Sequence, residues 1–91
     1  MIQHKNITLY GKVQGVFMRR TIKQEAQRIG VTGFVRNEPD TTVYIEAEAN
    51  EPVLEQFIEW LKAGAGDGSY GIQSVDIAEG AFKAFDQFEI T

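Results

Sequence analysis

The chain has 91 residues, enough for one domain around one hydrophobic core and too few for two. It contains no cysteine, which excludes a disulfide framework, a thiolate nucleophile and every zinc or iron–sulfur site that depends on cysteine. The formal net charge of −4 disfavours a general role in binding nucleic acid or an anionic membrane. We therefore expect a single cytoplasmic domain over residues 1–91 that holds any anion through a local positive site.

The first part of the chain is predicted to form a strand, a loop and a helix. Alternating apolar and polar residues predict the strand over residues 5–11. Apolar residues then recur at spacings of four and three over residues 20–29, which predicts a helix with one apolar face. Gly30 is placed to end this helix in a left-handed conformation. The single histidine, His4, is expected to be exposed at the start of the strand.

Two further strands are predicted in the middle of the chain, over residues 31–37 and 42–49, joined by a turn at residues 38–41. The strand over residues 42–49 alternates most regularly, with apolar side chains on one face and polar ones on the other. We expect the polar face, which includes Glu46 and Glu48, to be in contact with solvent.

The second half of the chain is predicted to form a helix, a loop and two short strands. Asn50 and Pro52 indicate the start of the helix, with a capping side chain and a proline in the first turn. Residues 64–71 contain four glycines and are predicted to be a loop. Short apolar patterns predict strands near residues 75–77 and 88–90.

The order of the main elements is strand, helix, strand, strand, helix, strand. Because connections are short and crossovers in one sheet are right-handed, both helices are expected on the same face of an antiparallel sheet. The predicted fold class is α+β, a ferredoxin-like βαββαβ sandwich. This architecture supports enzymes, RNA-binding domains and regulatory modules alike, so the fold alone does not predict the function.

The loop between the first strand and the first helix has the composition of an anion site. Its sequence, residues 11–20, is GKVQGVFMRR. Glycine permits close backbone approach, so several N–H groups can point into one concavity at the start of a helix. Arg19 adds a planar charged fork that can bind two phosphate oxygens. Taken alone, such a loop is more often a geometric turn than a functional site.

A second segment, GVTGFVRN at residues 30–37, adds to this pattern. Together the two segments resemble the acylphosphatase family, whose signature is G-x-V-Q-G-V-x-aromatic-R followed, after one helix, by G-aromatic-V-x-N. The matching residues are Gly11, Val13, Gln14, Gly15, Val16, Arg19, Ala26, Gly30, Gly33, Phe34, Val35 and Asn37. Chain length and element order are also similar to those of the family.

The resemblance implies an acylphosphatase (EC 3.6.1.7), which hydrolyses the carboxyl-phosphate bond of acyl phosphates to a carboxylate and inorganic phosphate. It implies that Arg19 and Asn37 are catalytic, with Arg19 holding the phosphoryl group and Asn37 positioning the attacking water. The residues implied to bind the phosphate are Gln14, Gly15, Val16, Phe17, Met18 and Arg19. Neither a metal nor a cofactor is expected, because phosphoryl transfer from so activated a substrate depends on positioning and charge stabilisation.

The expected partners are a small-molecule acyl phosphate as substrate and inorganic phosphate or sulfate as inhibitors. We expect a monomer without nucleic acid or membrane contacts.

Three positions depart from the family pattern. Met18 stands where the family has an aromatic residue, and we expect it to pack beneath the loop. Thr41 replaces a glycine, and we expect the turn to be rebuilt with a negative φ at this residue. The loop at residues 64–71 lacks the family's Gly-Pro and is expected to border the mouth of the site.

Two other functions remain open at this stage. One is a noncatalytic module that binds an anion or carbamoyl phosphate, although such a module would not need Asn37. The other is an RNA-binding domain, for which Tyr10 and Tyr44 could stack on bases but the acidic residues are unfavourable. Arg20 and Arg36 are expected to be solvated charges, and Phe34 is expected in the core.

Overall fold

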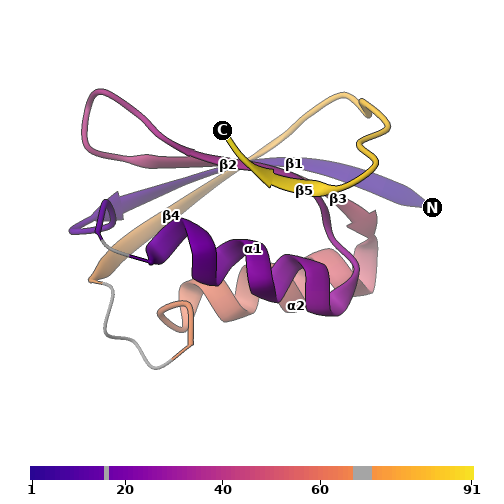
Figure 1. Ribbon diagram of the computed structural model, residues 1–91. Helices are drawn as coiled ribbons and strands as arrows, with labels where there is room; N and C mark the ends of the chain where they lie inside the picture. The colour runs from indigo at the N-terminus through magenta and orange to yellow at the C-terminus, as the bar shows by residue number, and fades with distance from the viewer. Residues whose placement is uncertain (16, 67–70) are drawn as a thin grey trace.

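The computed structural model describes residues 1–15, 17–66 and 71–91 of the chain. In these residues two helices pack on one face of a five-stranded sheet (Figure 1). The elements are β1 (Ile2–Gly11), α1 (Met18–Ile29), β2 (Thr32–Asn37), β3 (Val43–Asn50), α2 (Glu51–Lys62), β4 (Ile72–Glu79) and β5 (Phe88–Ile90). The strand order is β4-β1-β3-β2-β5, antiparallel throughout except that β5 pairs parallel with β2. The predicted α+β sandwich with both helices on one face is confirmed.

The core lies between the helices and the inner face of the sheet. Ile7, Ile45 and Val35 stand opposite one another across β1, β3 and β2, and all three are fully buried. The helices contribute Met18, Ile22, Ala26, Leu54, Phe57, Ile58 and Leu61. Each large apolar side chain buried in this way stabilises the fold by roughly 1.5–3 kcal/mol relative to leaving it exposed. The same burial fixes the register, because a slip of one residue would turn the apolar side of a strand to solvent.

The helix ends agree only in part with the sequence prediction. Helix α1 begins at Met18, two residues earlier than predicted, and ends as predicted at Gly30, whose φ is 89°. Pro52 lies in the first turn of α2, but within the described residues the Asn50 side chain makes no capping bond. Its Oδ1 instead accepts a hydrogen bond of 3.4 Å from the amino group of Met1, so the predicted cap is wrong.

The outer face of the sheet is not the solvated surface that the strand pattern predicted. The segment over residues 80–87, between β4 and β5, crosses this face (Figure 1). Beneath it Glu48 is 2% exposed and Glu46 7%, and His4 is 3% exposed instead of lying free at the start of the strand. Phe34 lies half-buried on this face rather than in the core, with its ring 5.8 Å from that of Phe85. All four of these expectations were wrong because the covering segment is distant in sequence.

Three buried side chains and one exposed lysine form what we term the His4 cluster: His4, Glu46, Glu48 and Lys83. The Nδ1 atom of His4 lies 2.7 Å from Oε2 of Glu48, and its Nε2 atom lies 3.2 Å from Oε1 of Glu46. The Lys83 side chain donates to Glu46 at 2.7 Å. The backbone N–H groups of Lys83 and Phe85 donate to the two oxygens of Glu48 at 2.5 and 3.1 Å. The cluster therefore holds residues 80–87 against β1 and β3.

We predict that Glu48 makes the protein sensitive to acid. Burial acts to raise the pKa of Glu48, but hydrogen bonds from His4 and from the Lys83 and Phe85 backbones outweigh it and leave this pKa below the ordinary value. A carboxyl with a lowered folded-state pKa contributes stability above its unfolded pKa and loses it as the pH falls through the folded one. Thermal unfolding between roughly pH 6 and pH 3 should therefore show a smaller decrease in Tm for Glu48→Gln than for the wild type.

The exposed Glu55 on α2 provides the control for this measurement. Glu55→Gln should keep the wild-type dependence of Tm on pH. Equal slopes for the Glu48→Gln and wild-type proteins would show that the cluster does not confer the acid sensitivity.

A second prediction concerns Thr41, whose φ is 77°. The expectation of a turn rebuilt at negative φ is therefore wrong, and a β-branched residue occupies a conformation that glycine adopts without strain. Thr41→Gly should raise the free energy of unfolding by about 1 kcal/mol, as measured by urea denaturation. Thr41→Ala keeps the Cβ atom and should give a clearly smaller gain. A Thr41→Gly protein less stable than Thr41→Ala would show that unfolded-state entropy outweighs the strain.

Candidate active site

Three chain segments meet at one end of the sheet. Strand β1 ends at Gly11, β2 ends at Asn37 and β3 begins at Val43. Leu9 and Asn37 both pair with Val43, so they flank it on neighbouring strands, roughly 10 Å apart. The loop that leaves β1 and the residue that ends β2 therefore lie at the same end of the molecule (Figure 1).

Asn37 lies on the inner side of the sheet, the side of the helices. Residues directly opposite each other on paired strands share a face, and Val43, the partner of Asn37, is a buried core residue. Helix α1 packs on the same side, against β2 and β5. Asn37 itself is exposed at the rim, where its carboxamide can reach a bound molecule. Asn37 thus stands on the side of the sheet where α1 begins.

The first turn of α1 has the properties of an anion site. No described side chain caps this end, and the first turn contains no acidic residue. Within the described residues, no side-chain cap and no carboxylate of the first turn neutralises its backbone N–H groups and the positive end of the helix dipole. Arg19 lies in this turn, is partly exposed, and has no hydrogen-bond or ion-pair partner in residues 1–15, 17–66 and 71–91. Its guanidinium is available to an anion held at the helix start.

The loop is tied to the β2–β3 hairpin by the side chain of Gln14. Its Nε2 atom donates to the backbone oxygen of Glu38 at 2.6 Å and to that of Thr42 at 2.8 Å. These two carbonyl groups flank the hairpin turn, and Glu38 directly follows Asn37. Sequence reasoning placed Gln14 in the phosphate site for its backbone and missed this contact. A carboxamide inside an otherwise apolar stretch of loop was the available signal.

The other predicted loop residues are placed as follows. Met18 is 1% exposed and packs beneath the loop as predicted, and its N–H group lies 3.4 Å from the oxygen of Gly15. Phe17 precedes α1 with a φ of 76° and is 59% exposed. Val16, predicted to bind phosphate, lies outside the described residues. Residues 67–70 do so as well, and the prediction that the loop over residues 64–71 borders the mouth of the site therefore stays a prediction.

Arg36 lies next to Asn37 in the chain but is directed to the opposite face of the sheet. It pairs with Tyr44 on β3, and its guanidinium lies 5.0 Å from the centre of the Tyr44 ring and 2.8 Å from Oε1 of Glu38. Burial and a hydrogen bond to Glu46 raise the pKa of Tyr44 to about 12. Arg36 is exposed, as expected, but it is paired with Glu38 and does not enlarge the positive charge beside Asn37.

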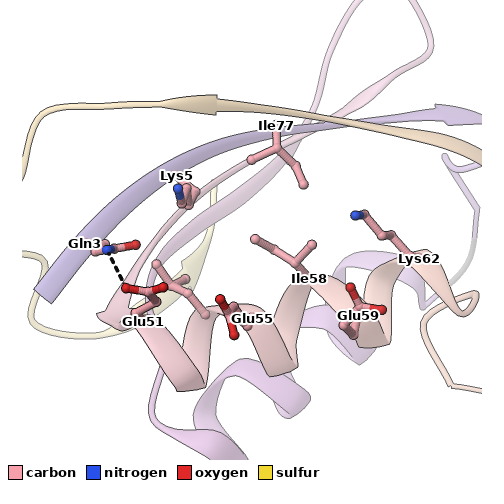
Figure 2. Close-up of a pocket in the computed structure, with 9 residues that line it drawn as sticks. Gln3, Lys5, Glu51, Glu55, Ile58, Glu59, Lys62 and Ile77 are labelled. Atoms are coloured by element: carbon pink, nitrogen blue, oxygen red, sulfur yellow. Dashed lines mark hydrogen bonds between the residues drawn. The ribbon is translucent and has the colours of Figure 1, made fainter.

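The pocket shown in Figure 2 lies elsewhere and contains no residue of the loop or the hairpin. It has a volume of about 370 Å³ between α2 and the strands β1 and β4, and Gln3 donates to Glu51 at one end of it (Figure 2). The part of the chain that the structure describes contains no cluster of three or more His, Cys, Asp or Glu side chains able to hold a metal ion. Neither helix in that part is long and apolar enough to span a membrane.

Comparisons of the sequence and of the structure with known proteins all point to the same family. The acylphosphatase family profile matches residues 5–90. An acylphosphatase of Ligilactobacillus salivarius is 38% identical over 99% of this chain and 99% of its own length. The structure of an acylphosphatase from Coxiella burnetii superposes with a TM-score of 0.89 at 26% identity, covering 99% of this chain and 93% of that one.

A part of a larger protein is also similar. Full-length HypF, in a phosphate- and nucleotide-bound form, superposes with a TM-score of 0.90 at 32% identity, covering all of this chain and 12% of that one. The profile match over residues 5–90 and the similarity along the full length of the Ligilactobacillus salivarius protein lead to one conclusion: the chain belongs to the acylphosphatase family of enzymes.

Proposed function

We propose that this chain hydrolyses acyl phosphates to a carboxylate and inorganic phosphate, with Arg19 and the loop amides of residues 14–18 binding the phosphoryl group and Asn37 positioning the attacking water. The observation that carries this proposal is made on the described residues: a helix start without a capping side chain or an acidic first turn, an arginine without a partner and an exposed carboxamide meet at one end of the sheet. The family relationship supports the reaction class.

The reaction requires little from the protein beyond placement and charge. Water adds its oxygen to phosphorus, the bond from phosphorus to the acyl oxygen breaks, and the acyl group leaves as a carboxylate. A carboxylate is a weakly basic leaving group, so it departs without a general acid. Backbone N–H groups and a guanidinium fork can bind the equatorial phosphoryl oxygens, where charge is concentrated during transfer.

Asn37 is suited to orient the water. A carboxamide offers both a hydrogen-bond donor and an acceptor, so it can fix the direction of a water lone pair. Its position at the end of a strand paired in register limits its freedom, and preorganisation of this kind reduces the entropy lost in reaching the transition state. Phosphate binding alone would not require this residue.

The alternative is a noncatalytic module that binds an anion or carbamoyl phosphate. The similarity to a small part of HypF fits this alternative only weakly, because similarity along the whole length is found with proteins named acylphosphatase. An RNA-binding role is disfavoured, because residues 80–87 cover much of the outer sheet face on which bases would stack. We also infer a monomer that inorganic phosphate and sulfate inhibit.

The first test of the proposal removes the cation. Arg19→Ala should lower the rate of phosphate release from benzoyl phosphate, measured with EDTA present, by roughly 100-fold or more, because one preorganised charge contact is lost. Phosphate and sulfate should raise the Tm of the wild type by binding its folded state, and should not raise that of the variant. Arg19→Lys should remain poor, because a point charge does not replace the fork.

Arg28 at the other end of α1, paired with Glu25 at 2.7 Å, is the matched control. Arg28→Ala should retain both activity and stabilisation by phosphate. If Arg19→Ala keeps near-normal turnover, Arg19 is not catalytic.

The second test separates an enzyme from a binder. Asn37→Ala should lower kcat severely and leave the inhibition constant of phosphate within a few-fold, because the water loses its orientation while the phosphate site remains. Asn37→Asp should weaken phosphate binding as well, because its carboxylate repels the phosphate dianion. Circular dichroism should show both variants folded. Wild-type turnover by Asn37→Ala would contradict the proposed role of this residue in positioning water.

A further inference from the structure

Phe17 combines two features that are unfavourable in the free protein. Its φ of 76° lies in the left-handed region, which is rare for a bulky residue and costs free energy. Its side chain is also 59% exposed, so little of that cost is recovered by burial. The residue is placed directly before the first turn of α1, next to the proposed phosphate site. A contribution to the stability of the folded protein therefore does not explain why an aromatic residue occupies this position.

The ring of Phe17 forms part of a shallow depression on α1. The depression has a volume of about 290 Å³ and is lined by Phe17, Arg20, Thr21 and Gln24. The Arg20 guanidinium lies 5.7 Å from the centre of the Phe17 ring. A volume of about 150 Å³ is enough to hold a benzene ring, so the depression has room for a planar group of this size.

The depression lies on the side of α1 that faces away from the sheet. Its four lining residues are spaced as i, i+3, i+4 and i+7, which places them along one stripe of the helix. The buried residues Met18, Ile22 and Ala26 form the opposite stripe, against the sheet. Asn37 is on the sheet, and the Phe17 ring is thus separated from it by the start of α1.

This arrangement matches the geometry of in-line phosphoryl transfer. The attacking and leaving oxygens lie on opposite sides of phosphorus. If water approaches from Asn37 on the sheet side, the acyl oxygen leaves toward the side of α1 that is turned away from the sheet. The acyl group, attached through that oxygen, then extends toward Phe17 and Arg20.

We propose that the depression lined by Phe17, Arg20, Thr21 and Gln24 is the subsite for the acyl group, and that the substrates it favours are acyl phosphates with an aryl or other bulky apolar acyl group. This inference rests on the proposed function, because the proposed function supplies the position of the phosphoryl group. Phe17 packs against the acyl group and Arg20 covers the contact. A short acyl group such as acetyl does not reach the ring and gains nothing from it.

The test compares two substrates in two variants. Phe17→Ala should lower kcat/KM for benzoyl phosphate about tenfold, mainly through KM, because an aromatic contact is lost. The ratio of kcat/KM for benzoyl phosphate to kcat/KM for acetyl phosphate should fall by the same factor of about ten, because both substrates share the loop amides and only the benzoyl group reaches the ring. Phe82, in the segment over residues 80–87, is equally exposed at 59% but lies near Ile29 and Gly30, at the opposite end of α1 from Phe17. Phe82→Ala should therefore leave kcat/KM unchanged for both substrates. A loss shared equally by both substrates, or no loss, would overturn the subsite.

A binding measurement keeps this inference distinct from the proposed hydrolysis. Benzoylphosphonate and acetylphosphonate lack the cleavable oxygen bridge, and their binding is followed by the rise in Tm. Benzoylphosphonate should stabilise the wild type more than acetylphosphonate does, and Phe17→Ala should abolish the difference. If the wild type hydrolyses neither acyl phosphate but shows this difference, the proposed reaction is wrong and the subsite stands. If both phosphonates stabilise equally, the subsite is wrong whether or not hydrolysis occurs.

Discussion

The candidate site depends on one side-chain amide. Gln14 donates to two backbone oxygens on either side of the β2–β3 turn, and through them it connects the loop before α1 to the hairpin that carries Asn37. Each such hydrogen bond adds only about 1 kcal/mol to stability, so the value of this contact lies in geometry rather than in energy. A glycine-containing loop has many conformations, and two bonds from a single group to neighbouring carbonyls exclude most of them. The loop proposed to bind phosphate and the residue proposed to position water are thereby held at a constant separation.

The two faces of the sheet differ in function: the inner face carries the candidate site and the outer face holds a covering segment. Two neighbouring residues of β2 show the difference. Asn37 faces the helices and the open end of the site, whereas Arg36 faces the outer surface and pairs there with Glu38. On that outer surface the His4 cluster holds down the segment over residues 80–87 through charged hydrogen bonds. Gly80 makes the packing possible, because a Cβ atom there would lie 2.3 Å from the His4 ring. Among the described residues, charge is thus neutralised on the outer face, whereas the first turn of α1 contains no acidic residue.

Local patterns in the sequence predicted the strands, the helices and their order, since apolar periodicity depends on residues close together in the chain. The candidate site was predicted by a different route, from the family resemblance of the local motifs in the loop and at the end of β2, and its residue roles stay a prediction. What the sequence did not reveal depends on contacts between distant segments. Glu48 alternates like an exposed residue and becomes buried only because Lys83 and Phe85 cover it. The positive φ at Thr41 was also missed, because a threonine at this position gives no local sign that the turn keeps a glycine-like conformation.

The parallel pairing of β2 with β5 has a consequence for the order in which the protein folds. β2 finds its second neighbour only in a segment about 55 positions further along the chain, where Gly33 pairs with Phe88. Closing so long a loop is entropically costly, and pairings of this kind form slowly compared with adjacent hairpins. We therefore expect β2 to remain an open edge while the β2–β3 hairpin is already formed. An open edge is a template for pairing with other chains, so the strand that ends in Asn37 is also the segment most exposed to misassembly before β5 docks.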